Sequence, residues 1–281
     1  MENNIRRRLV VLTLLPVILL SLIVSPAGFA STLYERSLKM LEVKIQASSP
    51  EDFTFVVLGD SRDNDAVFKK SLVLAKSFNP LFILHGGDVA YTGTEDKFNH
   101  FLSMVQEWAP DMPLFVVMGN HELTNNIKSA EGKILFQKLI GPLNYALDIR
   151  QLNLKVVTLD NSLYKLTSDQ LQYLRQQLTP GRKYNFTAMH VPPKIQRWNN
   201  DYSFSEGMDD LIKILAERKV DVVFFSHMHL YDEMTVQGVK YILTAGAGAP
   251  LRNPGYGESV YHIVVVNVKN GAVSTKMVRI H

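Results

Sequence analysis

The strongest constraint on the fold is a series of apolar runs, each of which ends in a carboxylate, an amide or an imidazole. The runs read "TFVVLGD", "LFILHGGD", "LFVVMGNH", "NFTAMH" and "DVVFFSHMH". Continuous apolar runs of this length are typical of strands that are buried on both faces of a sheet. The polar residues at their ends are Asp60, Asp88, Asn120, His121, His190, His227 and His229.

Helical patterns separate these runs and predict an α/β domain built in layers. "AVFKKSLVLAKSF" follows the first run and "EDKFNHFLSMVQEW" the second, while "TSDQLQYLRQQL" and "EGMDDLIKILAERK" precede later runs. Alternating strands and helices form sheets that are covered by crossover helices. Further strands are expected near the C-terminus, with turns at Gly238 and at Asn270-Gly271. We expect one folded domain over residues 52–281.

The N-terminus has the pattern of an export signal. Three arginines, Arg6 to Arg8, precede an apolar run over residues 9–24, and the small residues Gly28 and Ala30 follow it. This pattern predicts a signal peptide or membrane anchor over residues 1–30, either cleaved after Ala30 or retained across a bilayer. Because the arginines favour the cytoplasmic side, the rest of the chain is expected to be periplasmic, at the cell surface or secreted. Residues 31–51 are expected to form a linker.

The composition excludes several kinds of site. The chain has no cysteine, which rules out disulfides, thiolate metal ligands and a cysteine nucleophile. Its net charge is +3, and apart from the N-terminal arginines the basic residues are scattered, so no nucleic-acid partner is indicated. Any metal ion is therefore expected to bind oxygen and imidazole nitrogen.

The polar strand ends are expected to meet at one site. In open α/β sheets the carboxyl ends of the strands face the ligand crevice, so residues far apart in the sequence converge there. Aspartate, asparagine and histidine together suit zinc, manganese or iron. Two such ions a few ångströms apart need a shared carboxylate to offset their mutual repulsion.

The ordered set of motifs resembles that of the calcineurin-like metallophosphoesterases. The matching segments are "GDSR" at 59–62, "GDVAY" at 87–91, "GNHE" at 119–122, "LDNS" at 159–162, "TAMH" at 187–190 and "SHMH" at 226–229. The resemblance extends from about residue 53 to about residue 250. It implies a four-layer α/β/β/α sandwich with a two-metal site at one edge. It also implies a hydrolase that cleaves phosphate mono- or diesters by attack of a hydroxide held at a dinuclear centre of iron, manganese or zinc.

The resemblance also implies a role for each polar residue. Asp60 and His229 would bind the first metal ion, and Asp88 would bridge the two ions. His121 would meet the phosphate or protonate the leaving oxygen. The second metal ion would be bound by Asn120, His190 and His227.

Two positions depart from the family pattern. Arg62 stands where most members have a histidine ligand, and an arginine stays protonated and does not coordinate a metal. The purple acid phosphatase branch also lacks that histidine and uses a tyrosinate three residues after the bridging aspartate, which is Tyr91 here. Arg62 is expected either to bind a substrate phosphate or to pair with Asp63 or Asp65. Ser226 replaces a glycine that usually precedes the first histidine of the last motif.

Other residues near the motifs are interpreted as supporting ones. His85 is expected to pack beside the site, and Glu122 to orient the loop that carries Asn120 and His121. The loops after Glu122 and His190, "LTNNIKSAEGK" and "KIQRWNNDYSF", are expected to set the choice of substrate. In the second loop, the aromatic residues either stack on a base or sugar or anchor the loop: Trp198, Tyr202 and Phe204.

The predicted function is that of an exported, metal-dependent phosphoesterase. Its partner would be a phosphorylated small molecule or a phosphorylated component of the cell envelope, with membrane contact through the N-terminal segment if that segment is retained. The alternative is a catalytically weak or inactive envelope protein that binds phosphate or metal. Three lone histidines are assigned no site: His100, His262 and His281.

Overall fold

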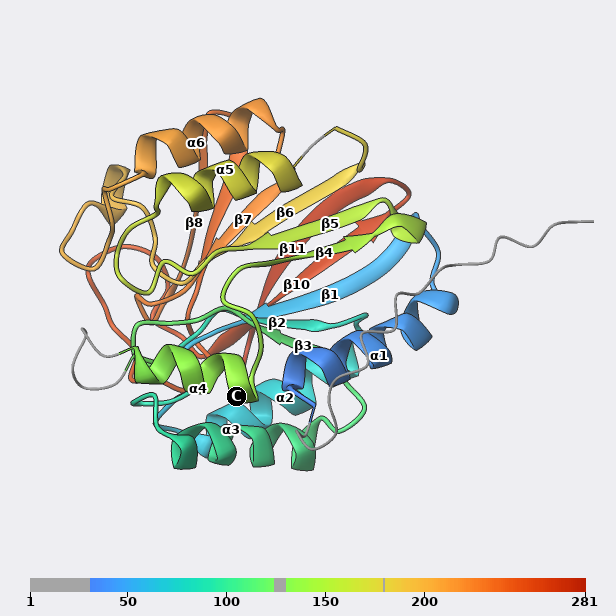
Figure 1. Cartoon of the computed structure of the whole chain (residues 1–281), viewed down its shortest axis with the longest axis vertical. Coiled ribbons are helices and arrows are strands. Elements are labelled where there is room, and N and C mark those ends of the chain that lie inside the picture. Colours follow the sequence, from blue (N-terminus) through green and yellow to red (C-terminus); the bar gives the residue numbers. More distant parts are fainter. Residues whose placement is uncertain (1–30, 124–129, 179) are drawn as a thin grey trace, which may run out of the picture. The chain divides into compact units, whose positions relative to one another are not determined.

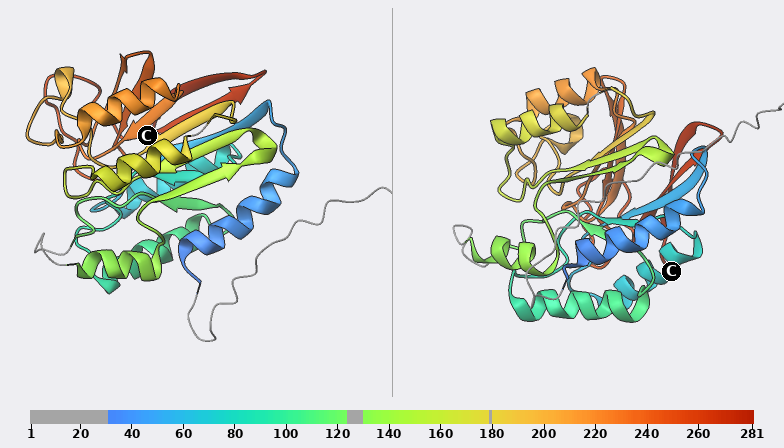
Figure 2. Two further views of the ribbon diagram at one scale, coloured as in Figure 1. Left: turned by 45° about the horizontal axis from the view of Figure 1, so that its top comes forward. Right: turned by 45° about the vertical axis from the view of Figure 1, so that its right-hand side comes forward.

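The computed structural model describes residues 31–123, 130–178 and 180–281 (Figure 1). The predicted export segment, residues 1–30, lies outside these ranges. The described residues form two sheets that face each other, with helices on the outer face of each sheet (Figures 1 and 2). The predicted α/β/β/α sandwich is therefore confirmed. No helix in the described ranges is long and apolar enough to cross a membrane.

The first sheet has the strand order β11-β10-β1-β2-β3. Its three parallel members are β1 (Asp52–Leu58), β2 (Ile83–His85) and β3 (Leu114–Val116). The antiparallel hairpin of β10 (His262–Lys269) and β11 (Ala272–Arg279) turns at Asn270-Gly271, as predicted, where φ is +50° and +78°. The outer face packs against α2 (Asp65–Ser77), α3 (Glu95–Trp108) and α4 (Glu131–Leu139).

The second sheet has the strand order β4-β5-β6-β7-β9-β8. Its parallel centre is β5 (Leu154–Thr158), β6 (Tyr184–Ala188), β7 (Val222–Phe225) and β9 (Val239–Thr244). The antiparallel edges are β4 (Tyr145–Ile149) and β8 (Tyr231–Val236). This sheet packs against α5 (Ser168–Gln177) and α6 (Met208–Glu217), and two short 3₁₀ turns lie at Arg150–Leu152 and Gln196–Trp198.

The space between the sheets is filled by large apolar side chains. Phe55 of β1 stacks on Phe82 with ring centroids 4.9 Å apart and meets Phe186 of β6 edge-on at 5.0 Å. All three rings are fully buried. Aromatic pairs of this kind add packing energy beyond the area they bury. These contacts fix the position of the two sheets, and therefore of their strand ends, relative to each other.

The prediction of a linker over residues 31–51 was wrong, because most of this segment is a helix of the domain. Helix α1 (Leu33–Gln46) begins at Thr32, which forms a capping box with Glu35. Its Ser37 hydroxyl donates to the Leu114 carbonyl at 2.8 Å and accepts from the Leu114 amide at 3.0 Å. Since β3 is the edge strand of its sheet, α1 satisfies backbone groups that would otherwise be unpaired. The compact unit accordingly starts at Ser31.

Candidate metal centre

The loops after β1, β2, β3, β6 and β7 bring the predicted site residues together at one edge of the two sheets. Four of these residues have left-handed backbone conformations: φ is +58° at Asp60, +56° at Asp88, +74° at His227 and +51° at His229. A residue other than glycine pays a conformational cost there, and such strain concentrates at functional sites. The chain turns sharply at these strand ends, and the four side chains are buried within one cluster.

One cluster of possible metal ligands consists of Asp88, His190 and His227, here called the second ligand group. One ligand atom from each lies within 4.8 Å of the others, and all three residues are buried. His190 Nε2 is 3.2 Å from Asp88 Oδ1 and 3.2 Å from His227 Nδ1. The half-buried Asn120 adds its Oδ1 at 3.0 Å from His190 Nε2.

The histidines of this group are oriented by hydrogen bonds on their far nitrogens. His190 Nδ1 is 2.8 Å from the Gly86 carbonyl, and His227 Nε2 is 2.8 Å from the Tyr164 hydroxyl. A proton on the far nitrogen leaves the lone pair of the other nitrogen directed into the cluster. Burial raises the pKa of Tyr164 to about 12, so its hydroxyl stays neutral. The second ligand group therefore fits a bound metal ion.

A neighbouring cluster consists of Asp60, Asp88 and His229, here called the first ligand group. Its ligand atoms also lie within 4.8 Å of one another, and its residues are buried. His229 Nδ1 is 2.8 Å from the Pro250 carbonyl, which directs Nε2 toward Asp60 Oδ1 at 3.4 Å. Asp60 Oδ2 accepts from the His227 amide at 3.0 Å, whereas the buried Oδ1 has no hydrogen-bond partner among the described residues. A buried carboxylate oxygen without a hydrogen bond is costly and calls for a cation.

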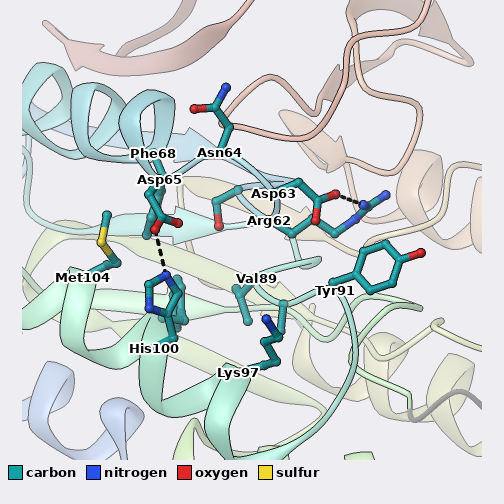
Figure 3. A pocket seen from close by; sticks show the side chains of 13 residues that line it. Arg62, Asp63, Asn64, Asp65, Phe68, Val89, Tyr91, Lys97, His100 and Met104 are labelled. Atoms are coloured by element: carbon teal, nitrogen blue, oxygen red, sulfur yellow. Dashed lines mark hydrogen bonds and ion pairs between the residues drawn. The ribbon is translucent and has the colours of Figure 1, made fainter.

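Arg62 lies against this first ligand group. Its Nε is 3.3 Å from Asp88 Oδ2, and its Nη2 is 3.4 Å from His229 Nε2. Nη1 pairs with Asp63, one of the two partners expected for it (Figure 3). The side chain is only 8% exposed. The first ligand group thus already has a cation in contact with two of its three members.

Tyr91 and His121 lie at the rim of the site. The Tyr91 ring lies beside the Arg62 guanidinium, with 5.6 Å between ring centroid and Cζ, and 5.4 Å from the His121 ring (Figure 3). His121 donates its amide to Asp88 Oδ1 at 3.1 Å, and its Nδ1 is 2.9 Å from the Tyr91 carbonyl. The Tyr91 residue is 57% exposed. Its role as a metal ligand stays a prediction.

A cavity of about 400 Å³ opens beside Arg62 and Tyr91. Its wall comes from the start of α2 and from one face of α3, where His100 Nε2 pairs with Asp65 Oδ2 at 3.0 Å (Figure 3). Lys97 also lines the cavity. A cleft of this size next to a polar cluster accommodates a small organic group.

Two supporting residues lie where the sequence interpretation placed them. Glu122 is buried and accepts three backbone hydrogen bonds, from Asp88 at 2.9 Å, Ala90 at 3.1 Å and Gly119 at 2.6 Å. Burial, and then the charge on Asp88, raise the pKa of Glu122 to about 8. His85 contacts the Ser61 hydroxyl at 2.9 Å and accepts from the Gly87 amide, and burial lowers its pKa to about 3. Neither side chain belongs to a ligand group. Both instead hold the loops that carry members of these groups.

In the loop after His190, two of the three aromatic residues predicted either to stack on a substrate or to anchor the loop are buried. Trp198 and Phe204 are buried, and the Trp198 indole donates to Asp232 at 2.8 Å, so both anchor the loop and neither is free to stack on a substrate. Tyr202 is 47% exposed, with its ring 6.0 Å from His227 and under the Arg252 guanidinium at 4.3 Å. It remains available to a substrate. Of the loop after Glu122, residues 124–129 lie outside the described ranges.

Tyr164 and Arg252 were missed by the sequence analysis. Tyr164 follows "LDNS" by two positions, and its own φ is +58°. Arg252 follows a glycine-rich turn and donates its amide to the His229 carbonyl at 3.1 Å. Neither position carries a local pattern that distinguishes it from a surface loop residue. The two residues lie on different loops, after β5 and after β9, and only tertiary contacts bring Tyr164 to His227 and Arg252 to Tyr202.

Ser226 fills the gap between two strand ends. Its hydroxyl donates to the Thr244 carbonyl at 2.8 Å. A Cβ added at Gly86 would lie 3.0 Å from Ser226 Cβ and well inside van der Waals contact with Ser226 Oγ. Gly86, the first glycine of "HGG", is therefore required by Ser226, the residue that departs from the family pattern.

Gly86→Ala is expected to lower the free energy of unfolding by about 1–3 kcal/mol, because the added methyl overpacks this contact. The double variant Gly86→Ala/Ser226→Gly should be no less stable than Ser226→Gly alone, since the serine causes the clash. Urea denaturation of the four proteins measures the coupling. Strictly additive losses would contradict this account of the strand-end packing.

Comparison with known proteins agrees with the fold. Residues 53–231 match the family model described as calcineurin-like phosphoesterase. A probable cyclic nucleotide phosphodiesterase of Vesicomyosocius okutanii is 25% identical over 179 residues, which cover 62% of this chain and 73% of that protein. A dimetal phosphatase of Danio rerio has 15% identity and a TM-score of 0.53, with 82% of this chain and 99% of that chain covered.

A purple acid phosphatase of yellow lupin superposes with a TM-score of 0.67 at 14% identity, covering 83% of this chain. The present chain spans about half of that protein, 52% of its length. These structural likenesses support the fold. The family model extends over more than half of the chain and includes all the polar strand ends. The chain belongs to the calcineurin-like phosphoesterases and is a hydrolase that acts on phosphoester bonds.

Proposed function

We propose that this protein is an exported, metal-dependent phosphodiesterase. The observation that carries the proposal is the buried second ligand group of Asp88, His190 and His227, with His121 at its rim. The choice of diesters is supported by two curated relatives, each named a probable cyclic nucleotide phosphodiesterase and 25% identical to this chain. Monoesters form the comparison class for the test.

The residues of the second ligand group would hold the metal ion. Asp88 and Asn120 offer oxygen, and His190 and His227 offer nitrogen, a donor set that suits manganese, iron or zinc. When bound, the metal lowers the pKa of a water molecule and neutralises charge on the phosphoryl group. Hydrogen bonds to Gly86 and Tyr164 keep both imidazole rings directed at the centre.

His121 is assigned the proton transfer to the leaving oxygen. Its amide is tied to Asp88, and its Nδ1 contacts the Tyr91 carbonyl at 2.9 Å. A proton on Nδ1 is thereby held by a backbone acceptor, which leaves Nε2 as the nitrogen that gives or takes a proton. The half-buried ring at the rim is accessible to substrate.

The cavity beside Arg62 and Tyr91 is assigned to the part of the diester that leaves. It adjoins the first ligand group through Arg62 and is lined by both charged and apolar side chains. The exposed Tyr91 ring offers a face for a planar group. A diester extends beyond the phosphorus on both sides, so it needs such a second subsite, whereas a monoester does not.

The test is turnover by protein stripped of metal and reconstituted with Mn²⁺, Zn²⁺ or Fe²⁺. Bis-p-nitrophenyl phosphate, p-nitrophenyl phosphate and 2′,3′- and 3′,5′-cyclic nucleotides form the panel. We expect activity that depends on metal and a kcat/KM at least about tenfold higher for diesters, which is about 1.4 kcal/mol of preference. Equal or better turnover of monoesters would overturn the diester assignment.

Export is proposed from the N-terminal arginines and the apolar run after them. Fractionation of cells that express the full chain, with antibody detection, tests it. The protein is expected outside the cytoplasm or in the membrane fraction. Protein that stays entirely in the cytoplasm would contradict export without affecting the proposed chemistry.

A catalytically weak or inactive phosphate-binding protein is the second candidate. Arg62 favours it, because this guanidinium contacts ligand atoms of the first ligand group. Such a protein should bind inorganic phosphate in calorimetry and turn over no ester with any metal. Turnover with one metal supplement excludes it.

A further inference from the structure

We propose that the Arg62 guanidinium replaces the metal ion of the first ligand group, so that this centre binds one metal ion tightly instead of two. The inference deepens the proposed function by defining its cofactor. It rests on the contacts of Arg62 with the very atoms that a first metal ion would require.

The contacts of Arg62 use two of the three ligand atoms. Nε meets Asp88 Oδ2 at 3.3 Å, and Nη2 meets His229 Nε2 at 3.4 Å. His229 Nδ1 lies 2.8 Å from the Pro250 carbonyl, so a neutral ring presents its lone pair at Nε2. A guanidinium has only donors and is always charged, so its N–H groups donate to the same lone pairs that a metal ion needs.

Arg62 is fixed in this position by its surroundings. Its backbone amide donates to the Asp88 carbonyl at 3.2 Å, Nη1 pairs with Asp63, and Tyr91 covers the guanidinium. Moving the side chain away would break charged hydrogen bonds that are largely shielded from water. A divalent ion placed among Asp60, Asp88 and His229 would also stand a few ångströms from a fixed positive charge. Both terms weaken metal binding at this position.

The second ligand group keeps its full donor set. The side-chain hydrogen bonds of Arg62 go to Asp63, Asp88 Oδ2 and His229. The contact between His190 Nε2 and Asp88 uses the other oxygen, Oδ1, at 3.2 Å. One oxygen of Asp88 therefore serves the guanidinium while the other serves the metal ion. The carboxylate that bridges two metal ions in the expected pattern would bridge an arginine and one metal ion here.

The vacated position is poised to accept a metal ion if Arg62 is changed to histidine. Asp60 Oδ1 is buried and has no hydrogen-bond partner among the described residues, and His229 and Asp88 would be freed. Histidine also supplies the imidazole that most of the family has at this position. Arg62→His is thus expected to create the second binding site that the wild-type chain lacks.

The experiment counts bound metal ions without reference to turnover. Wild type, Arg62→His and the control Arg175→His are stripped, equilibrated with Mn²⁺ and measured by calorimetry and elemental analysis. Arg175 lies on α5, is half-exposed and pairs with Glu217 of α6, so its replacement leaves the site unchanged. The expected ratios of tightly bound metal to protein are one, two and one. Electron paramagnetic resonance should show isolated Mn²⁺ in wild type and a spin-coupled pair in Arg62→His.

Two results would overturn the inference: two tightly bound ions per wild-type chain, or a ratio that stays at one in Arg62→His. If Arg62→His does not fold, Arg62→Ala serves the same purpose, because it frees the three ligands without adding a fourth and should bind a second, weaker ion. A ratio of one in folded Arg62→Ala would then count against the inference. Lack of turnover alone would refute the proposed function and leave the metal count to decide this question.

Discussion

Asp88→Asn is expected to lower kcat/KM by about 10³-fold or more and to empty the metal centre. Asp88 belongs to both ligand groups, and its two oxygens separately face His190 and Arg62. An amide keeps the shape but removes the negative charge that holds a cation, and electrostatic groups at such centres contribute several kcal/mol to catalysis. The measurement combines turnover of a diester with elemental analysis of the purified variant.

The matched control is Asp111→Asn, which removes an aspartate that is 72% exposed, is paired with Lys76 and precedes the start of β3, whereas the ligand groups follow the ends of the strands. It should leave both activity and metal content unchanged. Circular dichroism establishes that both variants fold. An Asp88→Asn protein that retains its metal and stays within about tenfold of wild-type activity would show that the carboxylate is not a ligand.

The positions of the site residues could be predicted because the fold itself dictates them. Asp60, Asp88 and Asn120 follow parallel neighbours β1, β2 and β3, and the carboxyl ends of parallel strands meet at the same edge. His190 and His227 follow parallel neighbours of the second sheet. Apolar runs with polar ends can be seen directly in the sequence. The meeting of these polar residues at one edge could therefore be predicted without knowledge of tertiary contacts or loop conformations.

What the sequence did not reveal depends on side-chain packing. Arg62 was expected to face a phosphate or an adjacent aspartate, and its contacts with Asp88 and His229 are set by the turn after β1. Tyr164 reaches His227 from a loop 63 residues earlier. No periodicity marks such contacts, because they depend on how a loop folds back over a sheet edge.

Helix α1 shows the same limit at the level of the fold. Its apolar residues Leu33 and Leu41 are spaced as on one helix face, which is compatible with a linker helix and with a packed one alike. The deciding group is Ser37, which pairs with both backbone groups of Leu114 on an edge strand. A serine at a helical position gives no sign of that partner.

Glu122→Ala is expected to lower the free energy of unfolding by at least about 3 kcal/mol. The fully buried carboxyl group accepts from the amides of Asp88, Ala90 and Gly119, and each buried donor left unpaired costs about 1–3 kcal/mol. These amides belong to the two loops that carry Asp88 and Asn120. The loss is therefore expected both in urea denaturation of the metal-free protein and as weaker metal binding.

Glu122→Gln separates the shape of the side chain from its capacity to accept. The amide oxygen can still accept from the Asp88 and Gly119 amides, which share Oε2, but the amide nitrogen would face the Ala90 amide and meet it donor to donor. This variant should thus lie between wild type and Glu122→Ala. Glu107→Ala, an exposed position on α3, is the control and should stay within about 0.5 kcal/mol of wild type. If Glu122→Ala is as stable as this control, the three hydrogen bonds do not hold the two loops together.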